Sequence, residues 1–180
     1  GPGFAERVAA CFVGGEWVAE SWRRYVSELF GFPRNSPDRP GVMVSMGAAE
    51  AGLHMLTETP ALRALRAACD SPGVRIRVFG EDRGYTPTLF TWDPKRVYPE
   101  ERFHTDGART LVFTSIGRRL LPLIRYDLDD EAQILDAATV DDGLADAGVD
   151  LRAEGPLIAV WGRHGAAIRG DGWELRPELI

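Results

Sequence analysis

Residues 110–130, TLVFTSIGRRLLPLIRYDLDD, decide how the second half of this chain folds. Two apolar, β-favouring runs, TLVFTSI and LPLIRYDL, flank a polar GRR turn, which predicts two antiparallel strands. The second run passes directly into a group of acids that continues to Glu131. Buried carboxylates need partners, so this segment predicts either a charged turn or a site where a ligand is held.

The sequence on both sides of this segment predicts a β-rich second half. VRIRVFG (74–80) and YTPTLFTW (85–92) flank EDRG as an expected hairpin. LIAVWGR (157–163) and AAIRGDGWEL (166–175) predict two further strands. The acidic stretch 127–148 has mixed helix and loop character and stays unassigned.

The first half predicts strands that alternate with helices. RVAACFVGG (7–15) indicates a strand and a turn, and VMVSMG (42–47) indicates a second strand. Between them, apolar residues at helical spacing predict the inward face of one helix: Val18, Trp22, Val26 and Leu29. Thr59 as N-cap and Pro60 in the first turn predict another helix.

These patterns predict an α/β fold, with βα units leading into a β-rich, largely antiparallel second half. No linker divides the chain, so residues 1–180 are expected to form a single domain or a fragment of one. Its α/β part covers about residues 8–70, and its β-rich part covers about residues 74–180.

Composition excludes several classes of function. The net charge of −6, the pI of about 5.1 and the single lysine, Lys95, argue against a nucleic-acid partner, because phosphate binding needs clustered cations. No apolar run is long enough to span a membrane. Cys11 and Cys69 lack metal-ligand or redox spacing, which predicts free thiols and, from them, a cytoplasmic protein.

Three local patterns suggest chemistry. Glu50 follows a small-residue loop after a strand, where a carboxylate can meet a ligand or a metal ion. The acids of RYDLDD can accept hydrogen bonds from hydroxyl groups, and Arg163 follows an apolar strand. Taken singly, each has a commoner structural role: a solvated helix start, a charged turn and a surface arginine.

Four sequence motifs, taken in their order along the chain, resemble those of the adenylate-forming (AMP-binding) superfamily. The resemblance is closest to its phenylacetate-CoA ligase-like branch. The first two motifs are GGE (14–16), followed by SELFG, and MGAAE (46–50). The others are LVFTSIGRRLLPLIRYDLDD (111–130) and GRHGAAIRGDGWELRPELI (162–180). The resemblance covers roughly residues 8–180, and it implies part of the large N-terminal domain of such an enzyme.

The resemblance implies an ATP-dependent acyl- or aryl-CoA ligase that activates a carboxylic acid as acyl-AMP and transfers it to a thiol. Asp130 would accept hydrogen bonds from the ribose hydroxyls, and Glu50 would bind Mg²⁺. The full nucleotide-binding set that it implies is Asp130, Arg163, Gly15, Glu16, Met46 and Gly47. The pocket for the acid would be lined by Ala48, Ala49, Gly52 and His54.

The cofactors implied are ATP or AMP, Mg²⁺ and coenzyme A. The partners implied are a small carboxylic acid and either CoA or a carrier thiol, and a homodimer is compatible with the sequence. The family's phosphate loop and its lysine-bearing C-terminal domain have no counterpart in these residues. We therefore expect no catalytic residue in this chain and no activity from it alone.

A second hypothesis is a degenerate, non-catalytic ligase-like domain used for binding or assembly. Met46 stands where the family has an aromatic residue, and Ala49 replaces its phosphate-contacting Thr or Ser, which favours this alternative. Retention of Glu50, Asp130 and Arg163 favours the enzyme. No residue decides between CoA, a carrier thiol and a protein side chain as the acceptor.

Overall fold

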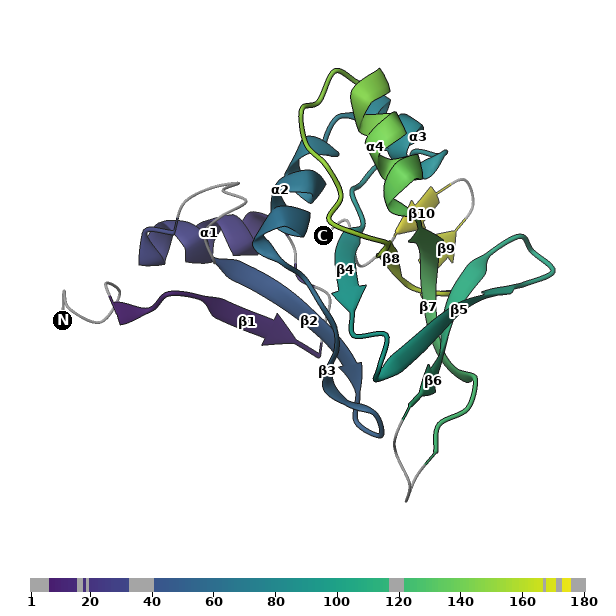
Figure 1. The fold of residues 1–180 in the computed structure, drawn as a ribbon. Coiled ribbons are helices and arrows are strands. Elements are labelled where there is room, and N and C mark those ends of the chain that lie inside the picture. The colour runs from purple at the N-terminus through teal and green to yellow at the C-terminus, as the bar shows by residue number, and fades with distance from the viewer. Residues whose placement is uncertain are drawn as a thin grey trace.

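A computed structural model gives the fold of this chain (Figure 1). It describes residues 7–15, 18, 20–32, 41–116, 122–166, 168–170 and 173–175. These residues form four helices and ten strands, eight of which make one mixed sheet. Figure 1 shows α1, α2, α3 and α4 gathered along one side of that sheet.

The large sheet has the order β1-β2-β3-β4-β8-β7-β6-β5. The bounds of its strands are β1 (Cys11–Gly14), β2 (Val42–Ala48), β3 (Gly52–Thr57), β4 (Thr88–Trp92), β5 (Val97–Phe103), β6 (Arg109–Ser115), β7 (Tyr126–Leu135) and β8 (Leu157–Arg163). β1 and β2 are parallel, and the other neighbours are antiparallel. The α/β class with a mostly antiparallel second half is confirmed.

Helix α1 (Glu20–Phe30) connects the two parallel strands and is followed by Gly31, whose φ is 67°. The predicted inward face is confirmed in part: Val18 and Val26 are buried, but Trp22 and Leu29 are exposed. In their place the helix buries Arg23 and Ser27. Arg23 can turn inward because Glu58 accepts two hydrogen bonds from its guanidinium group.

Helix α2 (Pro60–Ala68) begins where the sequence predicts. The Thr59 hydroxyl accepts a hydrogen bond from the amide of Leu62, and Pro60 occupies the first turn. Leu62 and Leu65 face inward together with Cys69, which lies just after the helix. This helix confirms its prediction because the local capping signals and the apolar spacing agree.

Residues 74–79 form a helix rather than the predicted strand. Helix α3 (Pro72–Phe79) has Pro72 at its first turn and ends at Gly80 in the left-handed conformation. The alternating sequence VRIRVF is typical of a strand, but Val74 and Val78 are buried one helical turn apart. The flanking Pro and Gly therefore outweighed the alternation, and no hairpin forms around 81–84.

The strand pair around residue 116 is confirmed in part. β6 fits the TLVFTSI prediction, whereas β7 begins only at Tyr126 and continues to Leu135. Residues 122–125 lie outside any strand, and Arg125 has a positive φ of 49°. β7 thus carries the acids inside the sheet, and the missed strand β5 pairs with β6 on its other side.

Helix α4 (Ala137–Asp146) follows β7 directly, capped by the Asp136 carboxylate, which accepts a hydrogen bond from the Thr139 amide. β9 (Ile168–Gly170) and β10 (Trp173–Leu175) form a separate two-stranded antiparallel hairpin. In the described part of the chain, no helix has the length and apolar character needed to cross a membrane. Cys11 and Cys69 are free thiols, as predicted.

The central strand β8 separates two hydrophobic clusters by strict alternation. Leu157, Ala159 and Trp161 face the cluster formed with α2, α3 and α4. Ile158 and Val160 face the other cluster. This period of two is expected for a strand that is buried on both faces.

The second cluster shows that the sheet is curved. It joins Val44 of β2 to Phe113 of β6, although these strands are far apart in the sheet order. It also contains Ala51, from the turn between β2 and β3, and Leu128 of β7. The curve therefore places the β2–β3 turn and the acidic segment on the rim of one hydrophobic core.

Candidate functional site at the β7–β8 junction

The acidic segment lies where β7 and β8 pair. Asp130 is registered opposite Arg163, and the register shifts between Glu131 and Ala132. Asp129 has a φ of 58°, a left-handed conformation that Asp tolerates better than most residues. In this irregular stretch Asp129 is exposed and Asp130 is buried. Asp130 lies two residues from both Leu128 and Ala132, which belong to the hydrophobic core.

Asp130 is a buried carboxylate, with only 8% of its surface exposed. Its Oδ1 atom lies 3.4 Å from Nε of Arg163, whose Nη1 donates to the Leu128 carbonyl oxygen at 2.8 Å. Burial raises the pKa of Asp130 to about 6, although the Arg163 charge lowers it. Asp129 and Asp127 raise it further by repulsion. Desolvation therefore outweighs the single ion pair.

Asp127 differs from Asp130 because several donors hold it. Its carboxylate accepts hydrogen bonds from Arg102, at 2.8 Å, from the Asp129 amide and from the Thr110 hydroxyl. Burial would raise the pKa of Asp127, but these donors together hold it below its usual value. This carboxylate is thus satisfied within the protein.

Asp129 faces a pair of histidines. The His164 Nε2 atom lies 3.1 Å from Oδ2 of Asp106, and its Nδ1 atom lies 3.6 Å from Oδ1 of Asp129. The rings of His104 and His164 are 4.6 Å apart between centroids, and His104 contacts the Thr110 hydroxyl. The hydrogen bond with Asp106 raises the pKa of His164. His164 thereby links the β5–β6 turn to the end of β8.

Glu131 is paired with Arg83. Its carboxylate accepts a hydrogen bond from Arg83, whose guanidinium carbon lies 4.6 Å from the centroid of the Trp161 ring. Arg83 also donates to Glu81 at 2.9 Å. Asp127, Asp130 and Glu131 therefore each pair with an arginine from another element, and the exposed Asp129 lies near His164. Of the three arginine pairs, that of Asp130 is the one in which no hydrogen bond joins the two side chains.

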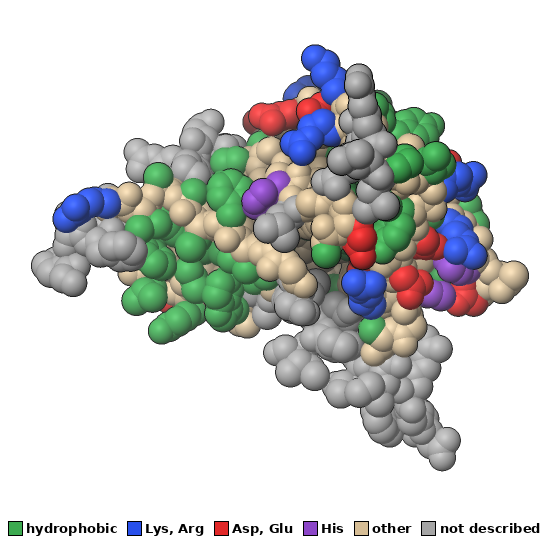
Figure 2. All heavy atoms as spheres, turned by 90° about the horizontal axis from the view of Figure 1, so that it is seen from below, with side chains coloured by type: hydrophobic (Ala, Val, Ile, Leu, Met, Phe, Trp, Pro, Cys, Tyr) green, Lys and Arg blue, Asp and Glu red, His purple; other side chains and the backbone are tan. Residues whose placement is uncertain are grey.

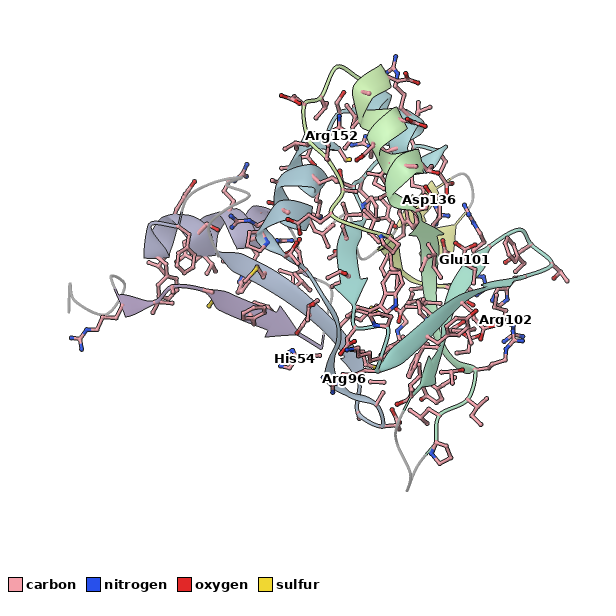
Figure 3. All side chains as sticks on the ribbon, in the orientation of Figure 1. His54, Arg96, Glu101, Arg102, Asp136 and Arg152 are labelled. Carbon is pink, nitrogen blue, oxygen red and sulfur yellow. The ribbon has the colours of Figure 1, made fainter. Side chains whose placement is uncertain are left out.

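Figure 2 shows two histidines beside acidic and basic side chains at the right of the view, whereas many hydrophobic side chains lie at the left, the end that carries β1 and α1. In Figure 3, Glu101 and Arg102 lie on β5 beside this charged end. The partners Arg83, Arg102 and His164 were not predicted as site residues. They lie far from Asp127–Glu131 in the sequence, so no local pattern could connect them with these acids.

The predicted site residues around the β2–β3 turn border the same hydrophobic core as the acidic segment of β7, but they belong to other strands. Met46, Gly47 and Ala48 end β2, and Gly52 begins β3 with a φ of 107°. Ala49 and Glu50 form the exposed turn between them. Met46 and Ala48 pack against the hydrophobic cluster that contains Leu128. Three strands separate β2 from β7 in the sheet order, so a shared ligand would have to be extended.

Other predicted residues are not brought to the junction. Gly15 is exposed after the edge strand β1, with a φ of 95°. His54 is exposed on β3, and Figure 3 shows it apart from Glu101 and Arg102 of β5. Glu16 lies outside the described residues. The acid pocket of Ala48, Ala49, Gly52 and His54 stays a prediction.

Glu50 is the one carboxylate that the sequence predicts as a metal ligand. Glu50 lies in the exposed turn, and residues 41–116 and 122–166 contain no group of three or more His, Cys, Asp or Glu side chains arranged to hold an ion. Mg²⁺ usually keeps several waters and binds one or two carboxylates together with substrate phosphates. Glu50 alone can supply one such ligand.

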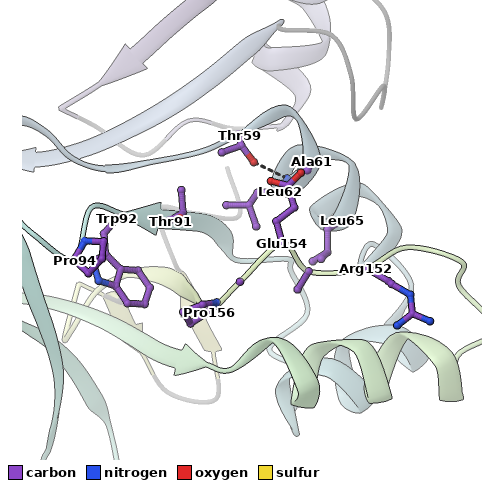
Figure 4. Close-up of a pocket in the computed structure, with 12 residues that line it drawn as sticks. Thr59, Ala61, Leu62, Leu65, Thr91, Trp92, Pro94, Arg152, Glu154 and Pro156 are labelled. Carbon is purple, nitrogen blue, oxygen red and sulfur yellow. Dashed lines mark hydrogen bonds between the residues drawn. The ribbon is translucent and has the colours of Figure 1, made fainter.

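A hollow of about 370 Å³ lies elsewhere, between α2, the end of β4 and the segment before β8 (Figure 4). Thr59, Leu62, Trp92 and Pro156 line it, with Arg152 at one end. None of the site residues predicted from the sequence lines it. Its walls are mainly apolar, and Arg152 and Glu154 are the charged residues among them. The β7–β8 junction, where the buried Asp130 lies beside Arg163, remains the stronger candidate site.

Comparisons with known proteins give no further guide to this site. No protein-family model matches the chain, and no curated protein matches it significantly.

Proposed function

We propose that this chain is the nucleotide-binding part of an ATP-dependent carboxylic acid ligase that forms acyl-AMP and passes the acyl group to a thiol such as CoA. Asp130 carries the proposal. It is a buried carboxylate at the junction of two strands, held by one arginine at 3.4 Å and with its pKa raised to about 6. A carboxylate in this state gains free energy from hydroxyl donors.

The ribose of AMP supplies two adjacent hydroxyl donors, and one carboxylate can accept both. Arg163, with most of its side chain exposed, lies beside Asp130 and can turn toward a phosphate or sugar oxygen. The shared hydrophobic core is consistent with the β2–β3 turn contributing to the same site. Glu50 would then meet Mg²⁺ bound to the nucleotide phosphates.

The resemblance described above supports the same assignment, including a domain that forms part of a larger adenylate-forming enzyme. In that proposal, Met46 to Ala49 and Gly52 lie beside the acyl group. The acid itself stays unspecified.

A second candidate is a degenerate ligase-like domain that binds no nucleotide. The observation that favours it is the pairing of Asp127 with Arg102 and of Glu131 with Arg83, because ion pairs within the protein can serve the fold alone. The two candidates differ in what they predict for Asp130.

Isothermal titration calorimetry of the 180-residue chain separates them. We expect saturable binding of AMP, and weaker binding of 2′,3′-dideoxy-AMP, which lacks the diol. Losing a hydrogen bond to a charged group costs about 1.5–3 kcal/mol, so Asp130→Asn should weaken AMP binding roughly tenfold to a hundredfold. Asp127→Asn, a matched change in the same strand, should leave the affinity within about twofold.

Two results would favour the degenerate domain. One is the absence of a binding isotherm with AMP at millimolar concentration. The other is equal affinity for AMP and its dideoxy form, or equal affinity in the Asp130→Asn and Asp127→Asn variants.

A further inference from the structure

The two edge strands of the sheet differ in how they are protected. β5 carries Pro99, Glu100, Glu101 and Arg102, and both proline and charge prevent an edge from pairing with another chain. β1 has the sequence CFVG, with no charge and no proline, and it lies at the other end of the sheet. Phe12 of β1 is exposed. The β1 edge, although only four residues long, therefore lacks the charge and the proline that protect β5.

Helix α1 adds a second apolar surface beside this edge. Trp22, Tyr25 and Leu29 are exposed, and their spacing places them on one face of the helix. Arg23, Val26 and Ser27 form the separate, buried face. An exposed apolar stripe on a helix whose buried face is already used indicates an interaction surface.

The stripe points away from the rest of the helical layer. Glu20, on the opposite side of α1 from the stripe, pairs with Arg66 of α2. α2 in turn packs on β4, toward the centre of the sheet. The stripe therefore faces the same side as the outer edge of β1, which pairs with no further strand among the described residues. We call Phe12, Trp22, Tyr25 and Leu29 together the β1–α1 edge surface.

We propose that a second copy of this chain docks on the β1–α1 edge surface. A two-fold axis beside β1 pairs this strand antiparallel with β1 of the second copy and brings the two α1 helices together. The interface is isologous, because each copy offers the same surface. This inference is independent of the nucleotide site.

The spacing of the elements fits this arrangement. Val26 of α1 packs with Cys11 and Val13 of β1 and with Val42 of β2, so the helix lies over these two strands. Neighbouring strands are about 4.8 Å apart. With α1 centred between β1 and β2, and the two-fold axis half a strand spacing outside β1, the helix lies one full spacing, about 4.8 Å, from the axis. The two helix axes are then about 10 Å apart, within the usual range for packed helices.

The area is sufficient for a specific contact. Large side chains bury about 150–250 Å² when they are fully covered, and roughly half of each edge-surface side chain is exposed. Covering Trp22, Tyr25 and Leu29 in each copy removes roughly 600 Å² from water. Phe12 lies on the opposite face of β1, because Cys11 and Val13 face α1, and there it meets Phe12 of the second copy across the paired strands. With the strand backbones, the total approaches the roughly 1,000 Å² expected of a biological interface.

Sedimentation equilibrium of the 180-residue chain and four variants tests the proposal. We expect a reversible dimer with a Kd on the order of micromolar. Leu29→Glu and Phe12→Glu should each raise that Kd at least about tenfold, because a charge enters the interface. The matched controls are Ile76→Glu, on a helix, and Phe103→Glu, on a strand. Leu29 and Ile76 are 61% and 53% exposed, and Phe12 and Phe103 are 56% and 72% exposed.

Circular dichroism of each variant checks that the fold is kept, which is expected because all four side chains are exposed. A monomer at about 100 μM overturns the proposal and leaves the surface to a different protein segment. A dimer that persists in both Leu29→Glu and Phe12→Glu, or one that the controls weaken equally, overturns it as well.

Discussion

Glu58 and Asp130 are two buried carboxylates that each face one arginine, yet their surroundings differ. Glu58 is 2% exposed and accepts hydrogen bonds from Arg23 at 2.6 and 3.1 Å and from the Val44 amide at 3.1 Å. Asp130 is 8% exposed, and its arginine lies at 3.4 Å. Burial raises the pKa of Asp130 to about 6.

The difference separates a structural carboxylate from one that is suited to a ligand. Glu58 uses its acceptors to join α1, β2 and the end of β3, and this pairing lets Arg23 lie in the protein interior. Asp130 retains acceptor capacity at the rim of a core. Polar groups that are buried but poorly satisfied often mark functional sites, because their cost is recovered on binding.

The largest effect is expected at Glu58. Glu58→Gln leaves Arg23 buried without its counter-charge, and breaking a buried pair in this way costs about 3–5 kcal/mol. Urea denaturation measures this loss directly. Glu100→Gln, which removes a partly exposed partner of Arg125, serves as the control and should cost less than about 1 kcal/mol. Equal losses in the two variants would show that the Glu58 pair is not a structural anchor.

Asp130→Asn should instead stabilise the protein, by about 1–3 kcal/mol at pH 7. The folded pKa of Asp130 lies above the ordinary carboxyl value, so the folded state binds the proton more tightly between about pH 4 and pH 6. The contribution of Asp130 to stability therefore falls as pH rises through this window. The gain from asparagine should be full above about pH 6 and vanish near pH 4.

Thermal or urea denaturation at several pH values tests this prediction. If Asp130→Asn both stabilises the protein and weakens AMP binding, the ionised carboxylate of Asp130 lowers the stability of the free protein but is needed for the ligand. An Asp130→Asn variant that is less stable than the parent at pH 7 would place Asp130 with Glu58 as a structural carboxylate.

The sequence predicted elements whose signals were local. α2 was located from Thr59 and Pro60, and β2, β6 and β8 from their apolar runs. α3 was missed because the alternation of VRIRVF outweighed the flanking Pro72 and Gly80 in the interpretation. The inward face of α1 was wrong in part, at Trp22 and Leu29, because apolar spacing cannot reveal that Glu58, 35 residues beyond Arg23, draws that arginine inside.

The candidate site likewise contains residues that the sequence predicted and residues that it did not. Asp130 and Arg163 were predicted from separate motifs, and the register of β7 with β8 brings them together. Their neighbours Arg83, Arg102 and His164 come from other elements, and only the curved sheet shows that they match the acids. The raised pKa of Asp130 depends on burial, which composition and spacing do not encode.

Carbon-13 NMR of the Asp130 carboxyl group, titrated with and without adenosine, tests the central claim most directly. Adenosine presents the ribose diol without a phosphate charge, so hydrogen bonding to the ionised carboxylate should lower its pKa. The account predicts a pKa of about 6 in the free protein and a clear decrease at saturating adenosine. A free pKa near the ordinary value of about 3.9, or one that adenosine leaves unchanged, would contradict it.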